Sequence, residues 1–277
     1  MPGGGQSRRT ALAGGLALGL MGAAAPRRVV SLNPCLDAIL VHVADRRQIA
    51  ALSHYSRDPN GSLIAGIAAG LPMTWETAEE VIALSADLVL TSRHSSAATR
   101  TALGRMKIRT ELFDVPDTVA DSDGQIRRIA ALVGREPRGE ALIRRIHAAI
   151  AASRPAAGQT PLSAIIYQPN GFAAGTGTLI DAMMREAGLQ NVAGRYGLSK
   201  WGQIPLERLI ADPPQVILAG EVAPGTPTWA DRVLTHPALA HLSHRVRKVS
   251  FPQRLLYCGG PTLIETAAVL RAARGQG

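Results

Sequence analysis

Apolar runs and helical patterns alternate along the chain from residue 27 onward. A short aliphatic run bounded by turn residues predicts a buried strand, and apolar residues recurring about every three or four positions predict a helix. The strands predicted in this way are 27–33, 48–54, 87–92, 108–113, 163–168, 215–220 and 245–250. The clearest helices begin at Pro34 and Pro205 or cover 75–84, 95–105, 178–187 and 261–273. Strands that alternate with helices indicate parallel sheets with right-handed crossovers.

The alternation stops between residues 118 and 153. Two helical patterns, 118–133 and 137–153, follow one another there without a strand, and Pro137 suits the first turn of the second helix. This interval is the best candidate for a bridge between two lobes. The sequence therefore predicts an α/β protein with two Rossmann-like lobes, mainly parallel sheets and a connecting helix. The predicted divisions are an N-terminal lobe at 27–133, the connecting helix at 137–153 and a C-terminal lobe at 160–277.

One helix–turn–strand unit occurs twice in the chain. Residues 77–92 read TAEEVIALSADLVLTS and residues 205–220 read PLERLIADPPQVILAG, and the two align without a gap at an offset of 128. Glu79 meets Glu207 in this alignment, and apolar residues meet apolar residues around them. The repeat indicates that the second lobe duplicates the first.

The first 25 residues differ from the rest of the chain. Arg8 and Arg9 precede an apolar run rich in Ala, Leu and Gly that ends in small residues, an order that predicts a secretory signal peptide. The paired arginines resemble a twin-arginine signal, although Ala11 replaces the usual phenylalanine. A retained membrane anchor is the alternative, but the run is short for a bilayer, which needs about 20 residues. We therefore expect an exported protein from which residues 1–25 are removed.

The composition is that of a globular protein, with 46% hydrophobic and 18% charged residues. The formal charge of +9 falls to +7 without residues 1–25, because they contain two arginines and no acid. No dense run of Lys or Arg supports nucleic-acid binding. The spacing of the two cysteines, Cys35 and Cys258, excludes a zinc-finger pattern. An oxidising compartment would permit a disulfide between them, yet two separate thiols are the preferred interpretation.

Candidate ligand-binding residues gather in the loops around the strand ends. Ligands of such sheets bind beyond the carboxyl ends of the strands. Aromatic residues make up only 4% of the chain, but six of them fall in connecting loops or at strand ends. The candidates are Tyr55, Arg57, Trp75, Arg93, Tyr167, Asn170, Trp201, Arg254 and Tyr257. An aromatic-lined cleft between two lobes would bind a sizeable ligand.

Six segments carry a resemblance to a known family. They read RRVVSLNPCLDAIL, SHYSRDP, AEEVIALSADLVL, YQPNGFAAGTGTL, PLERLIADPPQVIL and YCGGPTL, and the likeness runs from about residue 27 to 274. The chain resembles the periplasmic substrate-binding proteins of iron-siderophore and cobalamin ABC transporters. That resemblance implies a periplasmic monomer whose lobes are linked by one long helix, here 137–153. It also implies a shallow cleft and, as partner, the permease dimer of an inner-membrane ABC importer.

The repeated glutamates have a role in this family. One surface glutamate on each lobe docks into arginine pockets on the two permease subunits, and Glu79 and Glu207 are the matching residues. The alternative is that both lie on solvated helix faces, because Glu suits helices. Given the resemblance, docking is the preferred interpretation.

The resemblance also suggests a metal chelate as the ligand. Ferric siderophores are often anionic, and Arg57, Arg93 and Arg254 could bind their oxygens through rigid forks of donors. A ferric siderophore is therefore ranked first. Cobalamin or another corrinoid is second, because cobalamin-binding relatives have a tryptophan near the position of Trp75, and haem is a further alternative.

A bare metal site and an enzyme are the competing classes. His236, His241 and His244 lie close in sequence, but a zinc site needs several converging ligands, and the segment reads as an ordinary helix start. No nucleophile elbow, phosphate loop or full dinucleotide fingerprint occurs. We therefore expect neither catalysis nor a resident cofactor or metal, and a chelatase on the same fold is the least favoured alternative.

Overall fold

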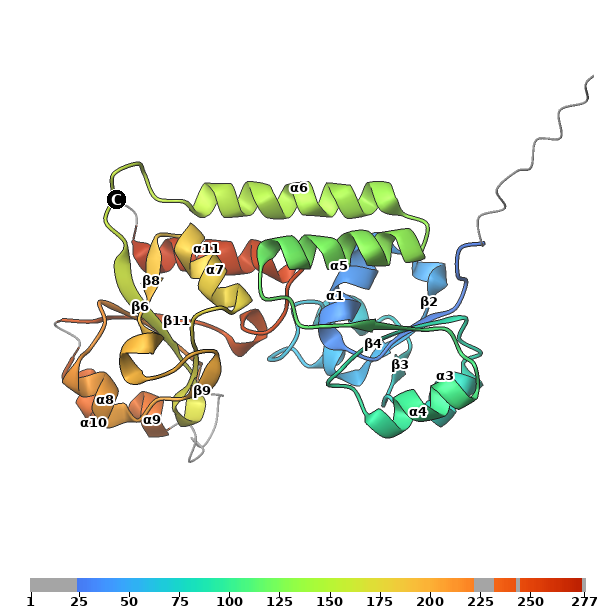
Figure 1. The fold of residues 1–277 in the computed structure, drawn as a ribbon, viewed down its shortest axis with the longest axis horizontal. Coiled ribbons are helices and arrows are strands. Elements are labelled where there is room, and N and C mark those ends of the chain that lie inside the picture. Colours follow the sequence, from blue (N-terminus) through green and yellow to red (C-terminus); the bar gives the residue numbers. More distant parts are fainter. Residues whose placement is uncertain (1–23, 222–231, 243–244, 276–277) are drawn as a thin grey trace, which may run out of the picture.

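The structure is a computed structural model, and it describes residues 24–221, 232–242 and 245–275. Two α/β lobes lie side by side, and long helices run along one side of both (Figure 1). All but the last two residues of the predicted signal peptide lie outside the described residues. Among the residues that the structure describes, no helix is both long and apolar enough to cross a membrane.

The N-terminal lobe holds a five-stranded sheet in the order β3-β2-β1-β4-β5, with every neighbouring pair parallel. Its strands are β1 (Val29–Ser31), β2 (Ile49–Ser53), β3 (Met73–Thr74), β4 (Leu88–Ser92) and β5 (Thr110–Phe113). Its helices are α1 (Pro34–Val43), α2 (Ala65–Ala68), α3 (Ala78–Ala83) and α4 (Ala97–Arg105). The central strand β1 is completely buried, as expected of a parallel sheet covered on both faces.

Short polar side chains start the helices at the carboxyl edge of this sheet. Asn33 accepts hydrogen bonds from the backbone N–H groups of Cys35 and Leu36 in the first turn of α1. Thr77 accepts one from the backbone N–H of Glu80 at the start of α3. Such caps satisfy donors that a helix leaves free. They fix the point at which each chain segment turns from strand to helix, and hence where the loops lie.

The C-terminal lobe holds a six-stranded sheet in the order β11-β10-β6-β7-β9, with β8 paired to β6. Its strands are β6 (Leu162–Tyr167), β7 (Phe172–Ala174), β8 (Leu189–Asn191), β9 (Trp201–Gln203), β10 (Val216–Ala219) and β11 (Arg247–Ser250). Its helices are α7 (Leu179–Glu186), α8 (Leu206–Ala211), α9 (Arg232–Thr235), α10 (Pro237–Ala240) and α11 (Thr262–Arg274). Only the pairings of β7 are antiparallel, so the predicted fold of two lobes with mainly parallel sheets is confirmed.

The repeated unit forms the same structure in both lobes. Helix α3 and strand β4 in the first lobe, and α8 and β10 in the second, begin at the offset of 128 that aligns the two segments. In the sheets, β4 lies between β1 and β5, and β10 lies between β6 and β11. The duplication read from the sequence is therefore a duplication of topology.

Two long helices, α5 (Val119–Leu132) and α6 (Glu136–Ser153), follow β5. Helix α6 contacts α1 and α5 as well as α7 and α11, so it spans both lobes (Figure 1). It buries an apolar face that consists of Leu142, Ile143, Ile146 and Ile150. Gly139 allows α5 to approach closely, because a Cβ there would lie 2.6 Å from the Cβ of Ala130. One hydrophobic core therefore continues through both lobes.

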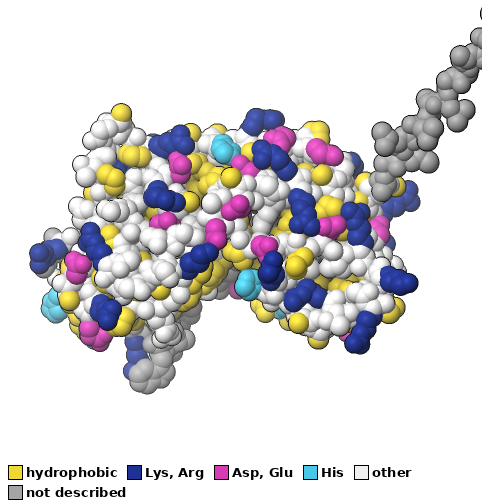
Figure 2. Space-filling view, viewed as in Figure 1, with side chains coloured by type: hydrophobic (Ala, Val, Ile, Leu, Met, Phe, Trp, Pro, Cys, Tyr) yellow, Lys and Arg dark blue, Asp and Glu magenta, His cyan; other side chains and the backbone are white. Residues whose placement is uncertain are grey.

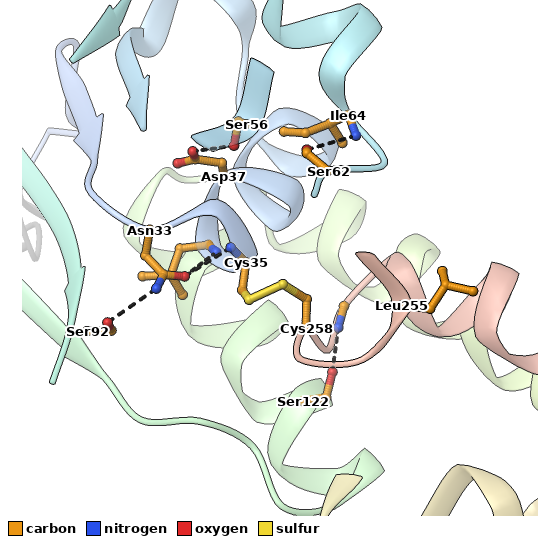
Figure 3. The surroundings of a disulfide bond; sticks show 12 residues. Asn33, Cys35, Asp37, Ser56, Ser62, Ile64, Ser92, Ser122, Leu255 and Cys258 are labelled. Atoms are coloured by element: carbon orange, nitrogen blue, oxygen red, sulfur yellow. Dashed lines mark hydrogen bonds between the residues drawn. A yellow bond between two sulfur atoms is a disulfide. The ribbon is translucent and has the colours of Figure 1, made fainter. Parts of the chain in front are cut away.

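Cys35 and Cys258 form a disulfide between the lobes, with their Cα atoms 5.0 Å apart (Figure 3). The preferred interpretation of two separate thiols is therefore wrong. The cysteines stand 223 positions apart in sequence, so only the fold shows that they are within bonding reach. Beside them, the backbone N–H of Gly260 donates to Ser122 Oγ at 2.8 Å. The bond and this contact join the start of α1 and α5 to the loop before α11.

Candidate ligand-binding cleft

The carboxyl ends of strands from both sheets meet at the junction between the lobes. Strand β1 leads into α1 and Cys35, while β11 leads through a short turn to Cys258. Lys200 of the C-terminal lobe also pairs with Asp117 of the N-terminal lobe, with Nζ and Oδ2 2.7 Å apart. The surface is hollowed between the lobes on the side away from α6 (Figure 2), and we call this hollow the cleft.

Three rings, which we call the N-terminal ring group, gather at the carboxyl edge of the N-terminal lobe. His54 and Tyr55 follow β2 directly, and Trp75 follows the neighbouring strand β3. The centroid of the His54 ring lies 3.9 Å from that of Tyr55 and 4.4 Å from that of Trp75. Tyr55 is 56% exposed and Trp75 is 60% exposed. The lobe thus presents an aromatic face to solvent, as ligand sites often do.

Polar contacts hold this ring group in place. Oε2 of Glu80, on α3, accepts hydrogen bonds from the backbone N–H of Trp75 at 2.8 Å and from Thr74 Oγ1 at 2.7 Å. The hydrogen bond from Thr74, followed by that from Trp75, lowers the pKa of Glu80. Oε1 of Glu76 lies 3.9 Å from Nδ1 of His54. The backbone at Trp75 and the ring of His54 are therefore each approached by an acid from the loop or helix after β3.

A second set of three rings, the C-terminal ring group, lies on the other lobe. Phe172 in β7 and Trp201 in β9 are stacked, with centroids 5.8 Å apart and ring planes 8° apart. Tyr257 lies 5.7 Å from Trp201 and is 43% exposed. It immediately precedes Cys258, so the disulfide places this group at the lobe junction. Each lobe therefore supplies one aromatic group, and Phe172 and His54 belong to them although neither was among the candidates chosen from the sequence.

Each of the three candidate arginines is engaged within its own lobe. Arg57 donates from Nη2 to the backbone oxygen of Leu71 at 2.6 Å. Arg93 pairs with Asp114. Arg254 pairs with two acids, with closest atoms 3.3 Å apart for Glu265 and 3.8 Å apart for Glu221. The arginine cluster that would bind an anionic chelate is thus not preformed by these residues.

Two other candidates have structural roles. Tyr167 is completely buried at the end of β6, and its hydroxyl donates to the backbone oxygen of Ile204 at 3.0 Å. Burial, followed by the charge of Glu207, raises the pKa of Tyr167 to about 12. The prediction that Tyr167 faces a ligand is therefore wrong, because its ring belongs to the core. Asn170 is exposed, and its φ of 59° makes the left-handed turn between β6 and β7.

Glu79 and Glu207 occupy the second position of α3 and α8, the two copies of the repeated helix. Both side chains are exposed. Helices α3 and α8 lie on the side of the molecule opposite α6, one on each lobe (Figure 1). Within the described residues, neither carboxylate takes part in an ion pair. The two glutamates are thus available to a partner that approaches this side.

Asp37 is an acid that the sequence did not single out. It is completely buried in α1, where its Oδ2 accepts hydrogen bonds from the backbone N–H of Ser53 at 2.9 Å and from Ser56 Oγ at 2.6 Å. Removal from water is the main cause that raises its pKa to about 8. Asp37 is therefore protonated and uncharged at neutral pH. It supports the segment that carries the N-terminal ring group.

No group of three metal-ligating side chains occurs among residues 24–221, 232–242 and 245–275. His236 caps α10, because its Nδ1 accepts a hydrogen bond from the backbone N–H of Ala238 at 3.2 Å. His244 lies outside the described residues. The histidine segment thus forms a helix start, as the sequence suggested.

The model of the periplasmic binding protein family matches residues 29–244 of the chain. Among solved structures, a periplasmic haem-binding protein of Roseiflexus sp. RS-1 is 21% identical with a TM-score of 0.71, and the match covers 90% of this chain and 99% of that one. An ABC-type Fe3+-hydroxamate transport system of Saccharomonospora viridis is 18% identical with a TM-score of 0.68, covering 91% and 94%. The periplasmic vitamin B12-binding protein of Vibrio cholerae is 18% identical with a TM-score of 0.63, covering 90% and 98%. No curated protein sequence matches the chain.

Proposed function

The chain belongs to the periplasmic binding protein family, and we propose that it captures a flat tetrapyrrole chelate of a metal, a corrinoid or haem, between its two lobes. The family consists of substrate-binding proteins that serve ABC importers rather than of enzymes. The proposed role is accordingly to bind the ligand without converting it and to release it to the permease.

The pair of ring groups is the observation that carries this proposal. Tyr55 and Trp75 are exposed on one lobe just after β2 and β3, and Tyr257 is exposed on the other lobe beside the disulfide at the lobe junction. Aromatic rings bury large areas against flat apolar surfaces and prefer offset stacking. A macrocycle placed in the cleft would cover rings of both lobes at once. Polar edges of such a ligand could then reach the hydroxyl groups of the two tyrosines.

An anionic siderophore is the second candidate. It would be favoured by free arginines, but Arg57, Arg93 and Arg254 already bond within their lobes. A ligand that recruited them would have to compete with those bonds. The order of ligands ranked from the sequence is therefore reversed, with the tetrapyrrole ahead of the ferric siderophore.

Glu79 and Glu207 are proposed as the contacts with the importer. They are exposed, occupy equivalent helix positions and lie on the same side of the two lobes. A permease dimer offers two equivalent binding sites. Two equivalent acids on a duplicated chain suit such a partner, and a hydrogen bond between charged groups contributes about 1.5–3 kcal/mol.

Equilibrium dialysis against cobalamin, haem and a ferric siderophore tests the ligand. The wild-type protein is expected to bind one tetrapyrrole per chain and to leave it chemically unchanged. Trp75→Ala should weaken this binding about fivefold, because loss of a stacked ring costs on the order of 1 kcal/mol. Dialysis is preferable to tryptophan fluorescence here, since the substitution removes one of the three tryptophans that would report binding.

Met106→Ala provides the matched control, because Met106 is an exposed apolar residue at the end of α4, away from the ring groups. It should leave affinity unchanged. Binding of the siderophore alone, lost in Arg57→Gln and retained in Trp75→Ala, would replace the tetrapyrrole by the second candidate. A chemically altered ligand would contradict the binding role itself.

A further inference from the structure

A hollow lined with arginines lies on the N-terminal lobe at the end of α1 opposite Cys35. It has a volume of about 540 Å³ and is lined by Arg27, Asp45, Arg46, Arg47 and Gln48. The side chains of all three arginines are exposed. Because α1 separates this hollow from the lobe junction, the ligand in the cleft does not reach it. Ligand binding in the cleft therefore does not account for the arginines of this hollow.

The charges around the hollow do not balance. Asp45 is the acid in the lining, and it is already held by two further arginines: Oδ1 lies 2.8 Å from Nη2 of Arg138, and Oδ2 pairs with Arg135. The guanidinium groups of Arg27 and Arg47 have no hydrogen-bond or ion-pair partner within the described part of the chain. An excess of positive charge thus faces solvent at one spot.

The hollow also lies beside the first described residues. Gln48 is buried and donates from Nε2 to the backbone oxygens of Pro26 at 2.9 Å and Val133 at 3.1 Å. The backbone N–H of Arg27 donates to Oδ2 of Asp87 at 2.7 Å. Residues 11–25, which directly precede Pro26 and Arg27, form the apolar run of the sequence. Lys and Arg side chains gather around the first described residues (Figure 2).

We propose that this arginine face, Arg27, Arg46 and Arg47, binds the anionic phospholipid headgroups of a bilayer. During export, before residues 1–25 are removed, an apolar run in the membrane places the residues immediately after it at the headgroups, where a basic patch adds an electrostatic contact. The guanidinium fork matches phosphate oxygens. In the exported protein, the same face keeps the molecule near the membrane that holds its importer.

Vesicle co-sedimentation of the exported protein, purified from the periplasm, tests the proposal. We expect binding to phosphatidylglycerol-containing vesicles, little binding to pure phosphatidylcholine vesicles, and loss of binding at high ionic strength. The variant Arg27→Gln/Arg46→Gln/Arg47→Gln should weaken the vesicle partition coefficient at least about tenfold, since each basic residue near an anionic surface adds favourably. Circular dichroism checks that the variants are folded.

Arg105→Gln/Arg185→Gln/Arg271→Gln is the matched control, because it removes the same charge from exposed helix positions elsewhere. It should retain most of the binding. Equal loss in both variants would overturn the proposal in favour of general positive charge. Equal binding to both vesicle types would overturn the proposal, because it would indicate apolar insertion. Displacement by dilute inorganic phosphate at constant ionic strength would overturn it too, because it would indicate that the site binds a soluble anion. Absence of vesicle binding would also overturn it.

Discussion

The carboxylate of Glu80 accepts a hydrogen bond of 2.8 Å from the backbone N–H of Trp75. Glu80 belongs to the first turn of α3, the helix that carries Glu79, and Trp75 is the most exposed ring of the N-terminal ring group. One turn of helix therefore connects the proposed ligand surface with the proposed docking surface. Thr74 also supports this link between Glu80 and Trp75, because its hydroxyl donates to the same oxygen.

Replacing Glu80 by Gln should loosen Trp75 without removing it. The charge-assisted bonds from Thr74 and Trp75 become weaker, so the free energy of unfolding should fall by about 1–2 kcal/mol. Ligand affinity should fall as well, by a smaller factor than in Trp75→Ala. Urea denaturation and equilibrium dialysis measure the two effects. An unchanged affinity in a measurably destabilised Glu80→Gln variant would show that Trp75 needs no such support.

Asp37 should make the stability of the N-terminal lobe fall as pH rises from acid values to about 8. Its pKa of about 8 in the folded protein exceeds the ordinary value of 3.8, so the folded state holds a proton that the unfolded chain releases. Stability should therefore fall as pH rises between these two values, by at most about 1.4 kcal/mol per pH unit. Asp37→Asn should remove this loss and be more stable than wild type at pH values near 8.

The effect of Asp45 on stability should have the opposite pH dependence. Hydrogen bonds from Arg135 and Arg138 lower the pKa of Asp45, so its contribution is present above the unfolded pKa and lost as pH falls through the folded one. Asp45→Asn should thus destabilise the protein at neutral pH and approach wild type in acid. Chemical denaturation over a pH series measures both variants. A pH-independent difference between Asp37→Asn and wild type would show that Asp37 is ionised in the folded protein.

Reduction of the disulfide should lower stability. Cys35 and Cys258 close a loop across a sequence separation of 223 residues, and a native disulfide typically contributes about 2–5 kcal/mol, largely by restricting the unfolded chain. The midpoint of urea unfolding should therefore shift downward in dithiothreitol. The double variant Cys35→Ala/Cys258→Ala should be insensitive to dithiothreitol, because the chain has no other cysteine. A wild-type midpoint that does not move would mean that the bond constrains little.

Loss of the repeated glutamates should impair delivery but not capture. Glu79→Ala and Glu207→Ala should each weaken binding to the importer in nanodiscs by at least about tenfold, as expected for a lost charge-assisted contact of about 1.5–3 kcal/mol. Ligand affinity should be unchanged in both. Glu136→Ala, an exposed acid on α6 at the opposite side, is the control. If the control weakened importer binding equally, the docking surface would have to be sought elsewhere.

Local pattern was sufficient to predict most of the fold. The strands of both sheet centres and the repeated helix were predicted, because each is an unbroken apolar run or an amphipathic turn flanked by turn residues. The pair β7 and β9 was missed. Each has only three residues, and they are separated by α7 and β8, so their pairing is a tertiary event without a local pattern.

The position of a ligand site at the strand ends remains a prediction from the sequence. Strand ends were the reason to expect Tyr55, Trp75 and Tyr257 in the site, and all three are exposed in the structure. The strand ends did not show the direction of each side chain, so Tyr167, the last residue of β6, was taken for a site residue although it faces the core. Nor could they show which carbonyls and acids engage the arginines. Those partners lie in other loops, and only packing brings them together.

The continuous core beneath α6 should make the two lobes of this duplicated chain unfold together. Two copies of one lobe could have remained independent domains, each with its own unfolding transition. Here the apolar face of α6 packs on helices of both lobes, and the buried cluster includes residues from each. Neither half can complete its interior alone. The molecule should accordingly show a single calorimetric transition, and a chain cut between the halves should regain its structure only when both fragments are mixed.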